Sequence, residues 1–478
     1  MKKKFLSNLI LLVFLNLLIK PFWFFGIEVA VQNRVGEEMY GFYFSLFNFA
    51  FIMNILLDIG ITNYNNRNIA RDQSRLGPSL TNIIPLKFIL SIFYALLVFL
   101  AGLVIGYDNI QFKLLLFLVI NQFLASFILY LRSNISGIQL FRTDSLLSVL
   151  DRTLMIILTG LLLWTNIARQ AFQIEWFVYT QTVSYCLTSL IIFIIVRYHA
   201  GRIRIRFNLI EMRSILKLSY PFALLILLMS FFNRADSVML ERLLPDGKFQ
   251  AGLYAQSYRV LDAFSQFSLL FAGLLLPMFS KMLKTKEKIG ELLQIAVSLL
   301  LTVSISVAVI GYFFNNDIIS LLYSEENGAS PKIFRLLMIG YIGISVSYIY
   351  GTLLTANRNL KQLNLLALVT VVINITLNLI LIPSHKALGA AIASLCSQGF
   401  YAISQVIISH RLFHLDLKRS LIPRVLVYAS VVILIAFGSM QLLNWLPAMI
   451  IVALGSIAAA ILTGLLRPKE LWGILAEK

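Results

Sequence analysis

Seven basic side chains lie inside long apolar stretches of this 478-residue chain. They are Lys20, Lys87, Arg132, Arg152, Arg234, Arg259 and Arg335. Charged groups at bilayer depth are energetically unfavourable and usually face the protein interior or a water-filled cavity. Arginine presents a planar fork of N–H donors that suits phosphate, and lysine presents a compact charge. Lys87 and Arg335 lie near the starts of their stretches, where we expect both to extend toward lipid headgroups. The other five are the predicted contacts of an anionic substrate headgroup.

Two of these five have neighbours in sequence that bear on their role. Pro21 follows Lys20 and predicts a kinked helix with a freed carbonyl near the charge, whereas a buried ion pair with an acid is the alternative. Arg234 and Asp236 are two positions apart and do not share a helix face, so they should not simply neutralise each other. A ligand contact is therefore open to both Lys20 and Arg234.

The remaining three have equally plausible structural roles. Arg259 and Asp262 have the i, i+3 spacing of an ion pair within a helix, so pairing and ligand binding are both open. Arg152 follows Asp151, and the two side chains point in different directions. Arg132 lies near the inner end of its stretch, where it can reach the lipid headgroups. The sequence alone does not choose between these roles.

Four acidic side chains lie within the apolar stretches or at their ends. They are Glu28, Asp58, Asp236 and Asp262. A buried carboxylate titrates nearer neutrality and can bind a coupling proton or Na⁺, and charge pairing with the arginines is the alternative. A cationic interior also responds directly to membrane potential. We expect no cofactor and no metal site.

The composition indicates which elements hold these charges. Hydrophobic residues make up 59% of the chain and charged residues 13%, with a mean hydropathy of +0.85. In soluble proteins about 45–50% of the residues are hydrophobic and about 25% are charged. A soluble enzyme is therefore excluded, and apolar stretches of roughly 20 residues can each span a membrane as a helix. We predict an all-helical polytopic membrane protein with about fourteen transmembrane helices. The predicted spans are residues 7–32, 40–62, 83–106, 112–138, 144–166, 172–197, 214–240, 251–280, 289–314, 331–356, 362–382, 387–410, 421–442 and 446–466.

The distribution of Lys and Arg predicts the orientation of the spans. With a cytoplasmic N-terminus, the inside connections hold 26 of the 40 basic residues and the outside connections hold 7. Because basic residues are retained on the cytoplasmic side, both termini are predicted to be cytoplasmic. The same rule explains the net charge of +18 without a nucleic-acid partner. The N-terminal stretch has no cleavage site after its apolar part and is predicted to be a retained first helix.

A short repeat indicates how the spans are grouped. Residues 41–43 (GFY) open the second span, and residues 252–254 (GLY) open the eighth, six spans later. Glycine followed by an interfacial aromatic is common, but its recurrence at corresponding spans predicts two six-helix lobes in parallel pseudo-repeat. The predicted parts are an N-terminal lobe (1–197), a basic linker (198–213), a C-terminal lobe (214–410), and two further helices with a short tail (411–478).

Longer motifs cover nearly the whole chain in a specific order. They are KPFWFFG (20–26), LLDIGITN (56–63), AGLYAQSYRVLD (251–262), LPMFS (276–280), LLYSEE (321–326), NITLNLILIP (374–383) and LGAAIA (388–393). In this order and spacing they resemble Wzx-type polysaccharide flippases of the multidrug/oligosaccharidyl-lipid/polysaccharide (MOP) exporter superfamily.

The resemblance implies a function that composition and spacing alone do not reach. It implies translocation of an undecaprenyl-pyrophosphate-linked oligosaccharide from the cytoplasmic to the outer leaflet of the bacterial inner membrane, by alternating access. The product would serve polysaccharide or O-antigen biosynthesis, and the partner implied is a polysaccharide polymerase. The headgroup would contact the five basic residues while the polyprenyl tail stays in the lipid bilayer.

Four alternatives stay open at this stage. A peptidoglycan lipid-precursor flippase is the nearest, and a multidrug exporter of the same superfamily is less favoured because organic cations require acidic cavities. A membrane polymerase or ligase of lipid-linked sugars needs a large outer loop, and a channel needs a symmetric pore. Since no nucleotide-binding or catalytic motif is present in the sequence, we expect a transporter and no enzyme.

Overall fold

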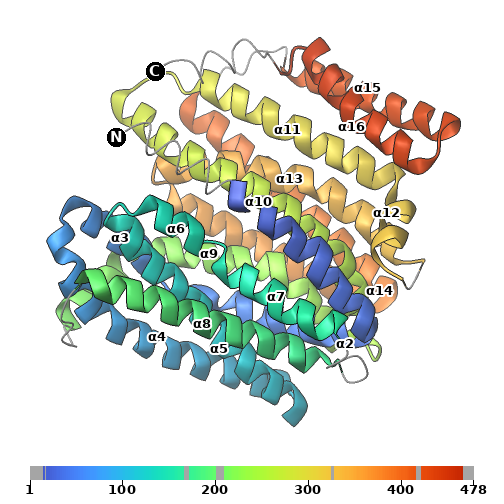
Figure 1. Ribbon diagram of the computed structural model, residues 1–478. Coiled ribbons are helices and arrows are strands. Elements are labelled where there is room, and N and C mark those ends of the chain that lie inside the picture. Colours follow the sequence, from blue (N-terminus) through green and yellow to red (C-terminus); the bar gives the residue numbers. More distant parts are fainter. Residues whose placement is uncertain are drawn as a thin grey trace. The chain divides into compact units, whose positions relative to one another are not determined.

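A computed structural model of the chain describes residues 14–16, 18–165, 172–200, 209–324, 328–415 and 421–466. Every regular element in these ranges is a helix (Figure 1). Twelve helices in this part of the chain are long and apolar enough to cross a membrane. Two of them contain a residue with non-helical backbone angles, Gly36 in Phe14–Ile52 and Lys386 in Leu360–Phe413. The all-helical fold class is confirmed, and twelve helices with two breaks agree with the predicted count of about fourteen spans.

The chain divides into two compact units, unit 1 (Met1–Gly252) and unit 2 (Leu253–Lys478). The boundary falls inside α10 (Gly247–Thr285). The predicted lobes, with ends at residues 197 and 410, stay predictions. Much of the predicted linker, residues 201–208, lies outside the described residues.

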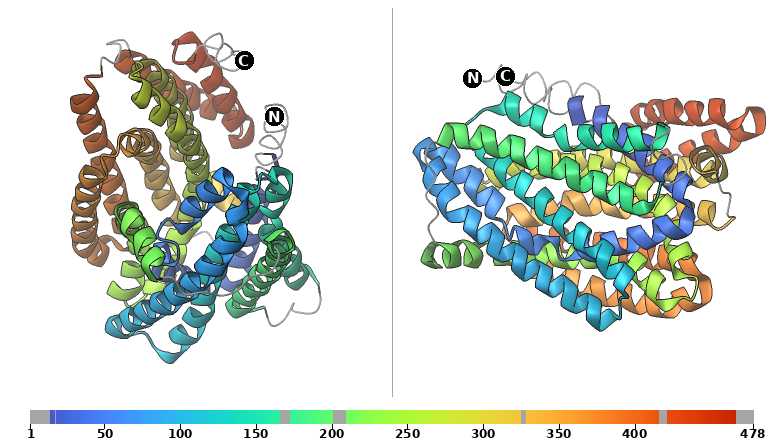
Figure 2. Two further views of the ribbon diagram at one scale, coloured as in Figure 1. Left: turned by 90° about the vertical axis from the view of Figure 1, so that its left-hand side faces the viewer. Right: turned by 60° about the horizontal axis from the view of Figure 1, so that its bottom comes forward.

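Unit 1 is built around α5, which packs against α2, α3 and α8, while α2 also packs against α9 (Figure 2). A capping box of Asp108 and Gln111 starts α5, because each side chain satisfies the backbone N–H of the other residue. The elements are η1 (Phe22–Glu28), α2 (Val29–Ile52), η2 (Asn54–Leu57), α3 (Ile61–Arg71), η3 (Gln73–Arg75), α4 (Leu76–Ile105), α5 (Asn109–Gly137), α6 (Phe141–Leu147), α7 (Leu150–Trp164), α8 (Ile174–Ala200), α9 (Leu209–Leu243) and the start of α10.

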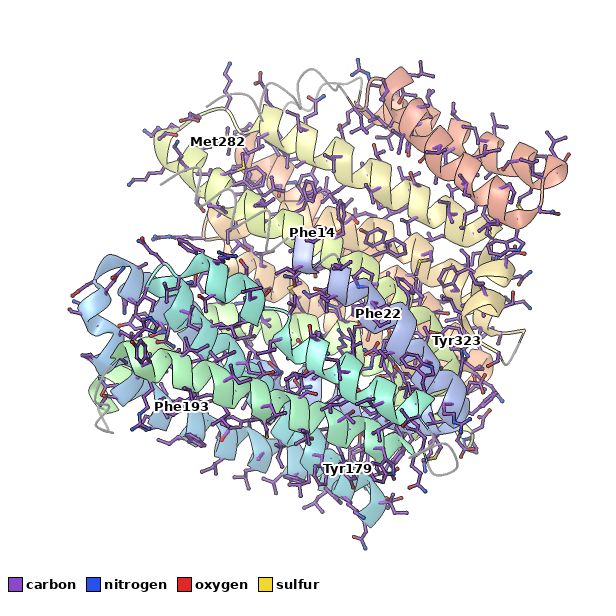
Figure 3. The ribbon with its side chains drawn as sticks, viewed as in Figure 1. Phe14, Phe22, Tyr179, Phe193, Met282 and Tyr323 are labelled. Carbon is purple, nitrogen blue, oxygen red and sulfur yellow. The ribbon has the colours of Figure 1, made fainter. Side chains whose placement is uncertain are left out.

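The first helix changes its hydrogen-bond pattern at Pro21, where the sequence predicted a kink. Pro21 keeps helical backbone angles, and the next seven residues, Phe22–Glu28, form the π-helix η1. Proline lacks the N–H that closes an α-helical turn, and π-turns inside helices occur frequently at functional sites. Phe14 and Phe22 project from this helix and are 60% and 51% exposed (Figure 3). The helix therefore presents apolar side chains outward beside Lys20.

The second predicted span, 40–62, is wrong at its C-terminal end. Helix α2 ends at Ile52, and α3 begins only at Ile61. Between them lie the short η2 and two residues with positive φ, Ile59 at 43° and Gly60 at 80°. Positive φ suits glycine, but it strains a β-branched residue such as isoleucine. The break places the carboxylate of Asp58 and the carbonyl of Leu57 outside regular α-helix.

The two glycines of the short sequence repeat meet in the structure. A Cβ atom on Gly41 would overlap the Lys248 carbonyl and the Gly252 amide nitrogen, and one on Gly252 would overlap the Glu37 carbonyl. Gln32 Nε2 donates to the Gly252 carbonyl oxygen at 3.1 Å. Side chains at either glycine would separate α2 from the start of α10, so glycine is required at both positions by close backbone approach.

In unit 2, α13 packs between α11 and α14, and α15 and α16 pack together against α11 (Figure 2). The core includes Tyr428, whose hydroxyl donates to the Thr302 carbonyl oxygen at 3.1 Å. The elements are the rest of α10, α11 (Gly290–Phe313), α12 (Asn315–Leu322), α13 (Ser330–Ala356), α14 (Leu360–Phe413), α15 (Leu421–Leu442) and α16 (Trp445–Leu462).

Candidate functional site

Arg152 is the centre of a polar cluster in unit 1, at the start of α7. Its guanidinium carbon lies 5.2 Å from the ring centroid of Trp23, and its Nε lies 4.0 Å from Asp151 Oδ2. One of its terminal N–H groups donates to Met155 Sδ at 3.4 Å, and the guanidinium interacts electrostatically with Tyr185 on α8. The indole face of Trp23 orients the guanidinium plane. The side chain is still 31% exposed, so part of it is accessible to a ligand.

Glu28 belongs to the same cluster and is held by the π-helix. Trp23 Nε1 donates to Glu28 Oε1 at 3.1 Å, a contact between residues five positions apart. Such a spacing is brought together by the i→i+5 pattern of a π-helix. Glu28 is 5% exposed and interacts electrostatically with Arg152. Both predicted roles of Glu28, charge pairing and ion coupling, therefore stay predictions.

Lys20 is the half-buried lysine of this cluster. It interacts electrostatically with Arg152 and Arg132, which repel its charge, and with Asp151, which attracts it. Among the residues that the structure describes, Lys20 makes no ion pair within 4 Å. Its ammonium thus keeps its donors for another partner, and the predicted alternative of a close buried pair with an acid is not seen within the described ranges.

Arg132 is tied to an acid that the sequence reasoning missed. Its Nε lies 2.8 Å from Asp144 Oδ1, and a second N–H donates to the Asp144 carbonyl oxygen at 3.5 Å. Asp144 is in the first turn of α6, and both side chains are less than one-fifth exposed. Arg132 is therefore a structural partner on α5 that adds to the field at Lys20.

The charges of this cluster balance. Three basic side chains (Lys20, Arg132 and Arg152) share the region with three acidic ones (Glu28, Asp144 and Asp151). The apolar stretches of the sequence hold seven basic and four acidic candidates, yet in this cluster the two kinds are equal in number. The cluster offers directed N–H donors rather than a large net positive charge. We call these six residues, with Trp23 and Tyr185, the Arg152 cluster.

Arg234 and Asp236 lie on α9 in unit 1, away from the contacts just described. Arg234 donates to Asn48 Oδ1 at 3.3 Å, and its guanidinium carbon lies 4.8 Å from the ring centroid of Phe51. Asp236 is fully buried, and the adjacent Ser237 accepts a hydrogen bond from Asn48 at 2.8 Å. Arg234 thus packs across α2 instead of joining Lys20 through any contact of the described residues.

Arg259 and Asp262 belong to α10 in unit 2. Arg259 is 7% exposed and Asp262 is half-buried. Both have polar or electrostatic partners in unit 2 or elsewhere in the chain. Their predicted roles as a helix pair or as ligand contacts both stay predictions. The structure therefore gathers Lys20, Arg132 and Arg152 within unit 1, whereas Arg234 contacts different residues and Arg259 belongs to the other unit.

Asp58 and Lys87 correct a further expectation. Lys87 was expected to extend toward lipid headgroups, yet its side chain is 1% exposed and its Nζ lies 2.5 Å from Asp58 Oδ1. Asp58 therefore takes the charge-pairing role. Arg335, the other residue expected to extend outward, lies over the ring of Tyr312 with 4.8 Å between the guanidinium carbon and the centroid.

Sequence reasoning missed the partners that orient Arg152 and Arg132. Trp23 follows Lys20 by three positions, a spacing that places both on one side of a helix, so it could have been noticed. Tyr185 and Asp144 carry no such signal, because their contacts depend on how α8 and α6 pack against other helices.

Comparison with known proteins adds to this geometry. A family model described as "Polysaccharide biosynthesis protein" matches residues 5–283. The capsular polysaccharide biosynthesis protein CapF of Staphylococcus aureus is 24% identical over 219 residues, which are 45% of this chain and 55% of CapF. The chain thus spans about half the length of this curated relative.

Solved structures share the fold over most of the chain. A lipid II flippase, MurJ, in an inward closed conformation is similar with a TM-score of 0.70 at 15% identity, over 95% of this chain and 98% of MurJ. An inward-facing multidrug resistance MATE family transporter of the MOP superfamily has a TM-score of 0.64 at 15% identity, over 84% of this chain and 98% of its own. The chain therefore shares its fold with these two solved structures.

Proposed function

The chain belongs to the polysaccharide biosynthesis protein family, and from this premise we propose that it is a flippase for a polyprenyl-pyrophosphate-linked oligosaccharide. The proposed substrate is an undecaprenyl-pyrophosphate-linked repeat unit that moves from the cytoplasmic to the outer leaflet of the bacterial inner membrane. Both termini are cytoplasmic in this proposal, and a polysaccharide polymerase uses the product. No covalent bond is made or broken during the movement.

The observation that carries this proposal is the Arg152 cluster. Lys20 keeps its ammonium donors, and Arg152 presents a partly exposed guanidinium whose plane lies over the ring of Trp23. A pyrophosphate has closely spaced anionic oxygens, so a fixed guanidinium fork beside an ammonium group matches its shape and charge. Charge-assisted hydrogen bonds of this kind are worth about 1.5–3 kcal/mol each.

The balanced charge of the cluster suits a transporter, because a transporter must release the headgroup that it binds. A large positive surplus would hold a pyrophosphate too tightly to release it, whereas Asp151 competes with the substrate for Arg152 and the nearby charge of Glu28 weakens the attraction. We propose that the headgroup displaces Asp151 from Arg152 when it binds and that Asp151 returns to the guanidinium when it leaves. The polyprenyl tail stays in lipid, and the energy comes from membrane potential or from a coupling proton or Na⁺.

A flippase for a peptidoglycan lipid precursor is the second candidate. It is supported by the fold that the chain shares with the lipid II flippase MurJ over 95% of its length. Both candidates carry a polyprenyl pyrophosphate, so the Arg152 cluster serves either one. A multidrug exporter is less favoured, because the accessible groups in the cluster, Lys20 and Arg152, are cationic and repel organic cations.

The leaflet on which the substrate accumulates tests this proposal. The gene is deleted in its host, and lipid-linked oligosaccharides on the two faces of the inner membrane are quantified with a membrane-impermeant sugar-modifying reagent. We expect repeat units to accumulate on the cytoplasmic face. Unpolymerised units on the outer face would indicate a polymerase instead, and accumulation of lipid II on the cytoplasmic face would select the second candidate.

A further inference from the structure

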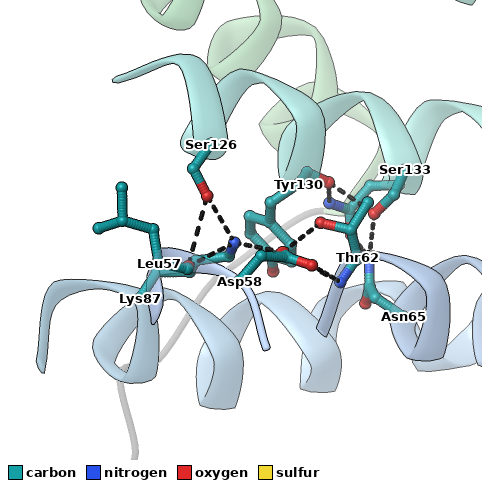
Figure 4. A network of polar contacts seen from close by, with 9 residues as sticks. Leu57, Asp58, Thr62, Asn65, Lys87, Ser126, Tyr130 and Ser133 are labelled. Carbon is teal, nitrogen blue, oxygen red and sulfur yellow. Dashed lines mark hydrogen bonds and ion pairs between the residues drawn. The ribbon is translucent and has the colours of Figure 1, made fainter. Parts of the chain in front are cut away.

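The ammonium group of Lys87 is enclosed by oxygen atoms, although it lies in the apolar helix α4 (Figure 4). Its Nζ donates to the Leu57 carbonyl oxygen at 2.9 Å, to Asp58 Oδ1 at 2.5 Å and to Ser126 Oγ at 3.1 Å. An ammonium group has three N–H donors, so protein oxygens use all of them. The ammonium is thus coordinated by a carbonyl, a carboxylate and a hydroxyl oxygen, which is how a protein holds a hard cation.

These oxygens are held in place by contacts that do not involve Lys87. Thr62 donates to Asp58 from its hydroxyl at 2.5 Å and from its backbone amide at 3.3 Å. The Ser126 hydroxyl lies 3.3 Å from the Leu57 carbonyl oxygen, to which it donates. Removing the lysine side chain would therefore leave an oxygen cage with one negative charge from Asp58.

The break between α2 and α3 explains why a main-chain carbonyl takes part. Leu57 ends the short helix η2, and Ile59 and Gly60 follow with positive φ. The chain thereby turns out of regular α-helix, so the Leu57 carbonyl faces the side chains of α4 and α5. Carbonyls freed at broken helices are the groups that transporters use to coordinate Na⁺.

We propose that the Leu57 carbonyl, the Asp58 carboxylate and the Ser126 hydroxyl form a site for a small monovalent cation, and that Lys87 is its tethered occupant. One carboxylate matches one positive charge. The lysine supplies that charge permanently, so unit 1 keeps the site filled without Na⁺ or K⁺. If Lys87 and Asp58 formed only a structural ion pair, removal of the lysine would leave no site that a free cation could occupy. This is where the two interpretations differ.

Replacement of Lys87 by alanine tests this directly. Thermal unfolding of purified wild type, Lys87→Ala and the double variant Asp58→Asn/Lys87→Ala is measured in NaCl, KCl and choline chloride at equal ionic strength. We expect Na⁺ or K⁺ to raise the Tm of Lys87→Ala by about 3 °C or more relative to choline, as expected for a ligand that binds only the folded state. Wild type and the double variant should show no such difference, because one has a filled site and the other has no carboxylate.

Equal Tm values of Lys87→Ala in all three salts would overturn the proposal. Lys20→Ala is the matched control, since it removes a lysine from an apolar helix without leaving a paired carboxylate, and it should not respond to the cation. If Lys87→Ala does not fold, Lys87→Ser offers a further oxygen to the cation, and failure of both to fold in Na⁺ and K⁺ would also contradict the proposal. The readout is stability, so it is independent of the proposed flippase activity.

Discussion

Lys20 and Lys87 are both lysines inside apolar helices of unit 1, but the protein surrounds them differently. Lys87 is 1% exposed, and three protein oxygens accept its three N–H donors. Lys20 is half-buried and makes no ion pair with a described residue, while two arginines lie within electrostatic range. A buried charge with all its donors satisfied is part of the structure, whereas a partly accessible charge with unused donors is available for a ligand. The same residue type therefore serves two purposes, and only the surroundings distinguish them.

The largest effect is expected when the enclosed pair is broken. Asp58→Ala leaves the Lys87 ammonium buried without its carboxylate, and we expect a loss of about 3 kcal/mol of stability, since breaking a buried pair is strongly destabilising. Thermal unfolding in detergent measures the change. The double variant Asp58→Asn/Lys87→Met removes both charges and should lose much less. If Asp58→Ala were as stable as wild type, the enclosed pair of Lys87 would not be part of what stabilises the fold, and Lys87 would not differ from Lys20 in this respect.

The accessible lysine should behave in the opposite way. Lys20→Ala is expected to leave the Tm within experimental error of wild type, because no ion pair of the described residues is lost. We expect its affinity for undecaprenyl pyrophosphate in detergent to fall by about tenfold, which corresponds to about 1.4 kcal/mol. Lys20→Arg, which keeps the charge, should retain most of the affinity. A large loss of stability with unchanged affinity would assign Lys20 a structural role.

An intermediate effect is expected for the orientation of Arg152. Arg152→Lys keeps the charge but loses the planar group that lies over Trp23. A double-mutant cycle with Trp23→Leu should give a coupling energy of about 1 kcal/mol in the unfolding free energy, as for a partly desolvated cation–π contact. Additive effects of the two substitutions would mean that Trp23 does not hold the guanidinium.

The smallest effect is expected for the exposed Asp72, which lies just before the candidate span Gln73–Ile105 and pairs with Arg75 in its first turn. Asp72 lies 3.4 Å from Arg75, and hydrogen bonds from the Ser74 hydroxyl and amide lower the pKa of its carboxyl. A lowered pKa contributes stability above the ordinary value of 3.8, and this contribution is lost as the pH falls through the folded-state pKa. Asp72→Asn should therefore be slightly less stable than wild type at neutral pH, and the difference should disappear in acid. Unfolding midpoints across this pH range measure it, and a difference that grows in acid would contradict the sign.

The fold could be predicted from the sequence because its main determinant is local. An apolar stretch of bilayer length specifies a helix on its own, and the spans at 421–442 and 331–356 lie within a residue of α15 and α13. The break before α3 was missed, since LLDIG (56–60) is almost entirely apolar and shows no interruption except one acid. Gly41 and Gly252 were noticed as a repeat, but their mutual contact depends on the packing of distant helices.

The candidate site could be predicted only in part for the same reason. Lys20, Arg132 and Arg152 were identified by type, because charges in apolar stretches are conspicuous. Their partners come from other helices, and the sequence carries no signal for the pairing of Arg132 with Asp144 or of Lys87 with Asp58. The balance of charge, which decides how tightly an anion is held, is thus a property of packing and cannot be read from positions along the chain.

Reconstituted translocation tests the central claim most directly. Wild type, Lys20→Ala and Lys20→Arg are placed in proteoliposomes with an undecaprenyl-pyrophosphate-linked oligosaccharide, and a membrane-impermeant reagent reports the rate at which the headgroup changes leaflet. We expect transfer by wild type and Lys20→Arg, and a rate at least about tenfold lower for folded Lys20→Ala. Transfer by Lys20→Ala at the rate of wild type, or no transfer by wild type under an imposed potential and ion gradients, would contradict the account.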